Sequence, residues 1–173
     1  ATALQFSDHS QEALRYIAQA HAILDELDKE FPRIHEYKLY SILNREGSIY
    51  TRLDQLDKAE ESLQKSLQLA ANLASRMPLA HSADLATAKM EMSGLNYVLG
   101  KNEEARKGFC QALDIFRRLQ TKEPVYDHPI ATVLQNLGVI CRHEEKYDDA
   151  EKFLKEAPVS YTHLRAHETV LDL

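Results

Sequence analysis

Apolar and small residues recur at helical spacing near the end of the chain, on both sides of a polar stretch at 143–146. These positions are Leu134, Leu137 and Gly138 before the stretch, and Ala150, Leu154 and Ala157 after it. The second set has the spacing i, i+4, i+7, which is one face of a helix. Small residues let two helices approach closely. The segment 131–157 therefore predicts two antiparallel helices joined by a short turn.

The same pattern recurs upstream with a period of 45 or 46 residues. Steps of 45, 46 and 46 residues lead back from Ala150 to Ala105, Ala59 and Ala13. Prolines keep a spacing of 46 residues independently, at Pro32, Pro78 and Pro124. Two markers with one period predict a chain of stacked helical repeats. The alternative is a helical bundle with Ala-rich seams.

The repeat frame divides the chain into one orphan helix and three helix pairs. We expect the orphan helix at 8–29 and the pairs at about 34–76, 82–120 and 127–157. The first helices of the pairs are predicted at 34–53, 85–99 and 130–143. Side chains suited to cap helices are those of Asp57, Ser82 or Asp84, and Asn102, and Gly100 is placed to end a helix.

The helix pairs resemble tetratricopeptide repeats (TPR), whose pattern is L-G-x2-Y followed by A-x3-F. The last pair has Leu137-Gly138 and Ala150-x3-Leu154, with Cys141 in place of Tyr. The first complete pair has Leu43, Gly47 and Tyr50 at the signature positions, and the middle pair has Met92-Ser93. The resemblance implies an all-α, TPR-type α-solenoid of antiparallel helix pairs that form a right-handed superhelix.

The style of the repeats is similar to the kinesin-light-chain-like branch of TPR proteins. The residues that carry this similarity are Asp127-His128-Pro129, Asn136-Leu137-Gly138 and the run 146–152. That branch also has long second helices. The period of 45–46 residues is longer than its usual repeat, and Gln135 stands where it usually has Asn.

Composition narrows the classes of partner. The chain has 173 residues and a net charge of −6, with only five Gly and no Trp. An acidic chain lacks the basic surface that nucleic acid requires, so no nucleic-acid partner is expected. No apolar run approaches the length of a membrane span, so no membrane partner is expected. Cys110 and Cys141 are isolated, which favours small buried residues in a reducing compartment and a cytoplasmic location.

No motif for catalysis, cofactor binding or metal binding is present. The chain has no G-x-S-x-G, P-loop or G-x-G-x-x-G pattern, so no enzyme activity and no cofactor are expected. His163 and His167 are spaced i, i+4 without the accompanying Glu of a zinc motif. Glu pairs at 60–61, 103–104 and 144–145 lie near the starts of second helices, where carboxylates favour the helix dipole.

The last sixteen residues, 158–173, break the repeat pattern. Pro158 lacks a backbone N–H and would stop the second helix that the frame continues. The run PVSYTHLRAHET resembles a translated sequencing adapter, with a sample barcode at Val170 and Leu171. We therefore interpret 158–173 as a non-native tail outside the repeat domain.

In the TPR family the inward positions of the first helices line the binding groove, and this resemblance implies a set of groove residues here. They are Ser41, Asn44, Ser48, Thr51 and Arg52; Thr87, Met90, Gly94, Tyr97 and Val98; and Thr132, Gln135, Val139, Arg142 and His143. The peptide-binding residues we expect among them are Asn44, Ser48, Arg52, Met90, Tyr97, Gln135, Val139 and Arg142. Few carboxylates occur in the set, which favours a peptide with an apolar anchor flanked by acidic residues.

Two functions fit this pattern. The chain is either an interaction scaffold that holds a protein or peptide in the groove, or a regulatory or sensor domain of a protein with a separate catalytic or DNA-binding domain. The repeat residues would look the same in both. The two ends of the solenoid are expected to expose apolar faces, which would permit self-association.

Overall fold

The computed structural model describes residues 2–30, 35–121 and 124–157. Over these residues the chain forms α-helices and one short 3-10 helix, with no strand. The elements are α1 (Thr2–Glu30), α2 (Glu36–Arg52), α3 (Leu56–Arg76), α4 (Pro78–Val98), α5 (Asn102–Gln120), η1 (Pro124–Tyr126), α6 (Asp127–His143) and α7 (Tyr147–Glu156). The predicted tail at 158–173 lies outside the described residues.

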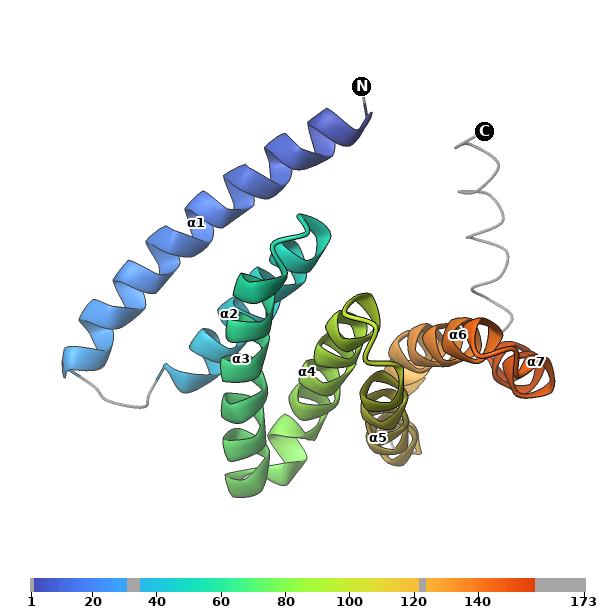
Figure 1. Cartoon of the computed structure of the whole chain (residues 1–173). Helices are drawn as coiled ribbons and strands as arrows, with labels where there is room; N and C mark the ends of the chain where they lie inside the picture. Colours follow the sequence, from blue (N-terminus) through green and yellow to red (C-terminus); the bar gives the residue numbers. More distant parts are fainter. Residues whose placement is uncertain (1, 31–34, 122–123, 158–173) are drawn as a thin grey trace.

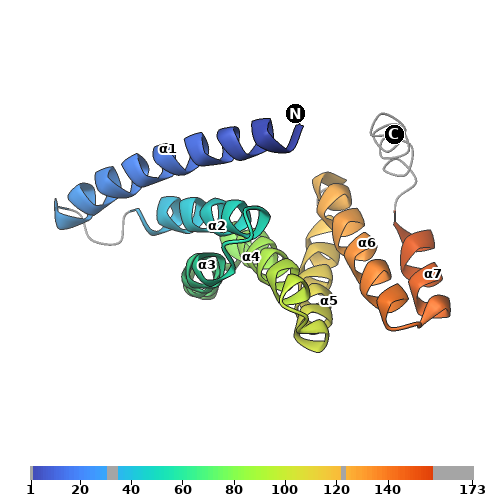
Figure 2. The same cartoon turned by 45° about the horizontal axis from the view of Figure 1, so that its top comes forward.

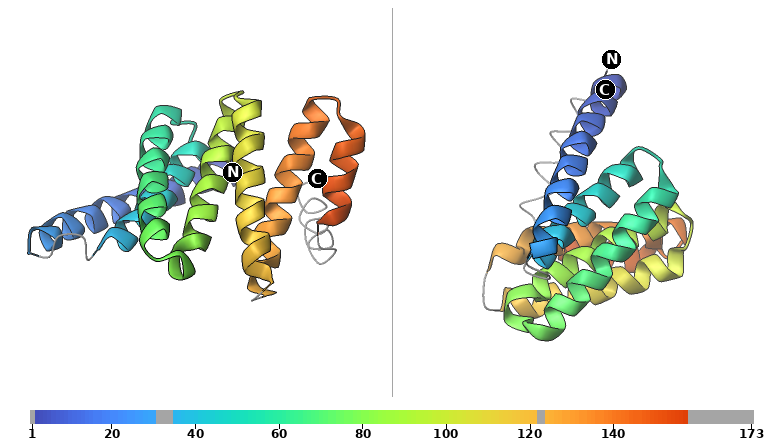
Figure 3. Two further views of the ribbon diagram at one scale, coloured as in Figure 1. Left: turned by 90° about the horizontal axis from the view of Figure 1, so that it is seen from below. Right: turned by 90° about the vertical axis from the view of Figure 1, so that its left-hand side faces the viewer.

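Three antiparallel helix hairpins stack side by side along the chain (Figure 1). The hairpins are α2–α3, α4–α5 and α6–α7, and their turns lie along one edge of the molecule (Figure 3). Helix α1 lies beside α2 as the orphan second helix of the frame (Figure 2). His21 of α1 approaches Glu46 of α2 at 3.5 Å. The predicted all-α, TPR-type solenoid is confirmed.

The start of α4 differs from the prediction, because the helix begins at Pro78 and not at residue 85. Met77 is the only residue between α3 and α4. Proline is favoured at the first helical position, where a missing N–H costs nothing. Neither predicted cap acts as one: the Ser82 hydroxyl donates to the Pro78 carbonyl at 2.7 Å, and the Asp84 carboxylate meets His81 at 2.8 Å.

The other predicted caps are also wrong. Helix α3 begins at Leu56, one residue before Asp57, and α5 begins at Asn102 itself. The residues at the N-cap positions are Gln55 and Lys101, and neither makes a capping hydrogen bond with its side chain. Their backbone carbonyls accept hydrogen bonds from the amides of Ala59 and Ala105, both at 3.0 Å.

The three hairpin turns have one geometry. Asp54, Gly100 and Glu145 have φ values of 58°, 75° and 60°, in the left-handed region. The next amide donates to a carbonyl five residues back, at 2.8–2.9 Å, in the pairs Gln55–Tyr50, Lys101–Asn96 and Lys146–Cys141. This is the Schellman motif that ends many helices. Gly100 ends α4 as predicted, and the same conformation recurs at an Asp and a Glu.

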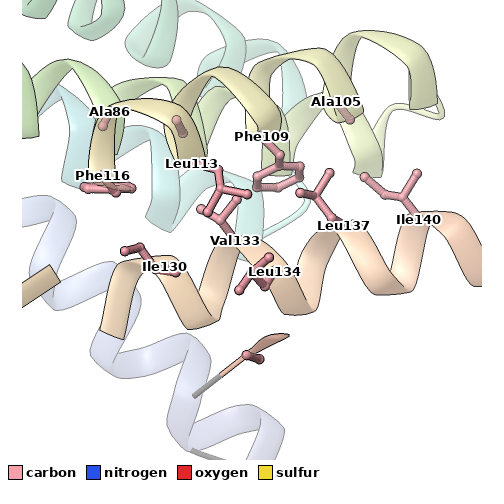
Figure 4. Close-up of a cluster of buried hydrophobic side chains, with 12 residues drawn as sticks. Ala86, Ala105, Phe109, Leu113, Phe116, Ile130, Val133, Leu134, Leu137 and Ile140 are labelled. Carbon is pink, nitrogen blue, oxygen red and sulfur yellow. The ribbon is translucent and has the colours of Figure 1, made fainter. Parts of the chain in front are cut away.

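The alanines that set the repeat frame are buried where helices cross. Ala59 and Ala105 are 0% exposed and Ala150 is 2% exposed. The largest core cluster joins two repeats (Figure 4). Its bulky members come from α5 and α6: Phe109, Leu113, Phe116, Ile130, Val133, Leu134, Leu137 and Ile140. The core is therefore continuous between hairpins.

The weak signature of the middle repeat is explained by an exchange of small residues between its two helices. Gly47 and Gly138 lie against Leu63 and Leu154 of their second helices. Ser93 takes the glycine position in α4, and Gly108 lies opposite it in α5. A Cβ at Gly108 would stand 2.1 Å from the Ser93 hydroxyl oxygen. The close approach is thus kept, with the glycine on the other helix.

Candidate functional site

A polar cleft runs between the first helices α2 and α4. It encloses about 320 Å³, and we call it the α2–α4 cleft. Its lining residues are Tyr37, Tyr40, Ser41, Asn44, Arg45, Ser48 and Arg52 of α2, with Asp84, Thr87 and Glu91 of α4. The α2 residues recur every three or four positions, so one face of that helix forms a full wall.

The structure brings part of the predicted groove set together in this cleft. Asn44, Ser48 and Arg52 line it, as do Ser41 and Thr87 from the wider set. Met90 and Tyr97 lie further along α4, half-buried against the core cluster that α5 and α6 form. The α6 residues of the predicted set are outside the cleft: Gln135, Val139 and Arg142.

Two carboxylates that are absent from the predicted set line the cleft, those of Asp84 and Glu91. Ser48 hydrogen-bonds Glu91, and the charge of Arg52 also acts on it. Burial raises the pKa of Glu91, while the Ser48 hydrogen bond and Arg52 oppose the rise. The sequence signal for these residues was available, because Asp84, Thr87 and Glu91 are spaced i, i+3, i+7 on one helix face.

Partly buried hydrogen bonds hold two of the residues that line the cleft. The Ser66 hydroxyl, from α3, donates to the Asn44 side-chain oxygen at 3.2 Å. The Tyr40 hydroxyl donates to the Asp84 carbonyl at 3.0 Å, which joins α2 to α4. Burial, followed by the charge of Asp84, raises the pKa of Tyr40. Asn44 and Tyr40 are thus fixed in place before any partner binds.

Comparison with known proteins agrees with this architecture. The sequence profile described as Tetratricopeptide repeat matches residues 40–73, which run from α2 into α3. Residues 40–73 thus match a tetratricopeptide repeat, and the chain has a TPR-type fold. No curated protein matches it.

A solved structure shows the same TPR-type fold over most of the chain. It is described as the crystal structure of BtubC (BKLC) from P. vanneervenii, with a TM-score of 0.65 and 23% sequence identity. The similarity covers 90% of this chain and 60% of that one. The TPR chain thus spans about 60% of the length of that protein.

A second contact between TPR first helices lies near the turn edge of the solenoid. The Tyr97 hydroxyl is 2.8 Å from Nδ1 of His143, and the two rings lie 5.6 Å apart. These residues are 46 positions apart and so occupy equivalent places in successive repeats. Tyr97 therefore bridges α4 and α6 and presents only part of its ring to the surface.

The two thiols of the chain lie in different surroundings. Both cysteines are free, but only Cys141 is buried as expected; the expectation is wrong for Cys110, which is exposed. Burial raises the pKa of both thiols, which makes the nucleophilic thiolate less available. Among the described residues, no group of three or more His, Cys, Asp or Glu side chains could hold a metal ion. No described helix is long and apolar enough to cross a membrane.

Proposed function

We propose that this chain is a protein-interaction scaffold that binds a peptide segment along its first helices. TPR repeats generally mediate protein–protein interactions, and their stacked helices provide extended concave surfaces. The observation that carries the proposal is the α2–α4 cleft, in which residues of two successive repeats line one continuous polar wall.

The side chains of the cleft suit the backbone of an extended peptide. Hydroxyl and amide groups at Ser41 and Asn44 of α2 and at Thr87 of α4 provide donors and acceptors on both sides of the cleft. Burial of a peptide against them is favourable only if its polar groups are paired. The polar lining therefore fits a segment whose backbone forms hydrogen bonds at intervals.

The sequence selectivity that we propose comes from the ends of this surface. An apolar side chain of the peptide packs against Met90 and Tyr97, and flanking acidic residues approach Arg52 or Arg142. The positive charge of Arg52 already interacts with Glu91 of the same chain. An acidic residue of the peptide that binds Arg52 therefore shares this arginine with Glu91. Arg142 is exposed on α6 and is reached without entering the cleft.

A peptide array probed with the full chain tests this proposal. We expect the array to select peptides with one apolar residue between acidic residues. With the best peptide, Tyr97→Ala should raise Kd more than tenfold, because a partly buried tyrosine that anchors an apolar side chain is a usual hot spot. Arg52→Ala should raise Kd about two- to fivefold, because exposed charges are screened.

Matched variants separate lost binding from lost folding. Tyr97→Leu keeps an apolar side chain and should retain more affinity than Tyr97→Ala. Lys65→Ala, on the exposed side of α3, should leave Kd unchanged. Thermal unfolding by circular dichroism shows whether each variant is folded. Selection of basic peptides, or binding that ignores Tyr97 in folded variants, would overturn the proposal.

A further inference from the structure

A second groove lies on a different face of α4 from the α2–α4 cleft. Helix α4 lies between α3 and α5, and both second helices pack against it rather than against each other (Figure 1). Near the connection from α3 to α4, the space between the three helices is a pocket of about 480 Å³. Most of its lining side chains are apolar, among them Ala74, Leu79, Leu85, Ile115 and Leu119.

A smaller pocket of about 280 Å³ continues the first one toward the hairpin turns, along the same three helices. On each helix the linings of the two pockets are one turn apart, at Leu67 and Ala71, Leu85 and Lys89, and Gln111 and Ile115. The two pockets therefore form one groove, which we call the α3–α5 groove. Its wall on α5 runs from Glu104 to Leu119, about 22 Å at the rise of an α-helix.

The repeats themselves leave the α3–α5 groove open. Additional repeats extend a solenoid at its ends, whereas this groove lies inside the stack, between two hairpins that are both present. Leu79 at its apolar end is 90% exposed, and Met77, two residues earlier, is 57% exposed. Exposed apolar side chains beside a groove are typical of an interaction site.

The lining of the groove is cationic, although the chain is acidic. Lys89, Lys107 and Arg118 line it, and among the described residues Glu104 is the only carboxylate in its lining. The Lys89 amine donates to an amide side chain of α5 at 2.7 Å. The Arg118 Nε donates at 3.1 Å to the backbone carbonyl of Asp114, whose side chain lies outside the lining. No described carboxylate pairs with any of the three cations, so the groove complements an acidic partner.

This positive charge is not a general property of the repeats. Glu61 and Asn72 stand 46 residues before Lys107 and Arg118, at the equivalent positions of α3. Glu61 pairs with Lys65 of its own helix at 2.7 Å. The repeat fold therefore does not require cations at these positions, and their presence in α5 is specific to this groove.

The apolar end of the groove favours a helix over an extended peptide. An extended backbone buried there would need hydrogen-bond partners. The Ser75 and Ser82 hydroxyls, which line this end, already donate to the carbonyls of Asn72 and Pro78. A helix satisfies its own backbone and presents only side chains, and a helix of about fifteen residues spans the groove.

We propose that the α3–α5 groove binds an acidic amphipathic helix of a partner polypeptide. The apolar face of this helix packs at the apolar end of the groove, against Leu79 and Ile115. Its Asp or Glu residues flank that face and approach Lys89, Lys107 and Arg118. This site is additional to the proposed function, because the groove shares no lining residue with the α2–α4 cleft.

The probe is a peptide of about sixteen residues with Leu at positions spaced i, i+3, i+4 and i+7, Glu on both flanks and Ala elsewhere. The ¹⁵N-labelled full chain is titrated with it to millimolar concentration, because a helix of this length is only marginally formed in water. We expect the amide signals of 67–75 and 104–119 to shift. Lys107→Glu should raise Kd about three- to tenfold, since an attraction becomes a repulsion. Leu79→Ser should raise it at least about threefold through the lost apolar contact. A side chain as exposed as Leu79 contributes little to folding.

Matched variants and peptides make the result specific. Lys152→Glu makes the same charge change at the equivalent position of α7, 45 residues after Lys107, and Kd should not change. Tyr97→Ala and Arg52→Ala should also leave Kd unchanged, so failure of the proposed peptide groove does not affect this test. The probe with Lys in place of each Glu, or with Ser in place of each Leu, should bind at least about tenfold more weakly.

Several outcomes would overturn the proposal. They are equal Kd for the wild-type chain and Lys107→Glu, equal affinity for the probe and its Ser-substituted form, and no binding at millimolar peptide. Shifts confined to 36–52 would place the probe in the α2–α4 cleft and would also overturn it. Self-association of the chain that Leu79→Ser abolishes would overturn it in favour of a second copy.

Discussion

At the residue scale, the exchange between Ser93 and Gly108 shows that close helix approach belongs to a pair of positions. In the first and last hairpins, glycine lies on the first helix and a leucine packs over it. In the middle hairpin the first helix carries Ser93, whose hydroxyl donates to the Lys89 carbonyl at 2.6 Å. Gly108 then leaves room for that hydroxyl. A change at one position should therefore depend on the residue at the other.

We predict that Gly108→Ala destabilises the chain by about 1–3 kcal/mol, because its Cβ would overlap the Ser93 hydroxyl. Combined with Ser93→Gly, the same change should cost less than the sum of the two single variants. Chemical denaturation of all four proteins gives the coupling free energy. Additive costs would show that the two residues do not share the contact.

Gly94→Ala is the matched control for this cycle. Gly94 also lies in α4, but a Cβ there would meet nothing within 4 Å. The variant should be more stable than wild type by about 0.5–1 kcal/mol, because alanine restricts the unfolded chain and favours the helix. Loss of stability in Gly94→Ala would mean that alanine is unfavourable in these helices for reasons other than overlap.

The raised pKa of Glu91 predicts how the stability of the chain depends on pH. Its pKa is higher in the folded chain than in the unfolded chain, chiefly because of burial. The protonated form is thus favoured by folding, and this contribution is present at low pH and lost as pH rises through the folded-state pKa. The gap in unfolding free energy between Glu91→Gln and wild type should shrink as pH falls from 7 into the acid range. A gap that does not change with pH, measured by urea unfolding, would contradict this.

At the element scale, each hairpin turn depends on one residue in the left-handed region. Gly100 adopts it without cost, whereas Asp54 and Glu145 carry a Cβ that this conformation disfavours. Gly100→Ala should destabilise by about 1 kcal/mol, although no atom lies near the new Cβ. Glu145→Gly should stabilise by up to about 1 kcal/mol. Thermal unfolding midpoints that move in the same direction for both variants would exclude this explanation.

The elements also show what could be predicted from the sequence and why the rest could not. The helices follow from the period of buried positions such as Ala59 and Ala105, because that spacing is dictated by the packing of each hairpin. The start at Pro78 was missed because proline is equally common in linkers and at the first position of a helix. The cleft carboxylate Glu91 was missed because a family groove pattern was applied, whereas the partner of Ser48 depends on how α2 lies against α4.

At the scale of the whole molecule, each hairpin contacts mainly its neighbours, and stability is passed along the stack through shared cores. The cluster around Phe116 joins α5 to α6 and includes Ala157 at the end of the last hairpin. Separate clusters around Tyr40 and Leu63 join α2 and α3 to α4. In such a stack, intrinsic repeat stability and nearest-neighbour interfaces add approximately. Weakening one interface should therefore affect the repeats unequally.

Phe116→Ala tests this expectation. Phe116 is 1% exposed and its ring lies 6.1 Å from that of Tyr126, at the junction between the second and third hairpins. Its truncation should cost about 3–5 kcal/mol. Amide hydrogen exchange should show faster exchange over 127–156 and near-normal protection over 36–76, because α2 and α3 do not use this interface. Val125→Ala, at an exposed neighbouring position, should change neither region. An equal loss of protection in every hairpin would show that the solenoid unfolds as one unit, with coupling too strong for the interfaces to be treated separately.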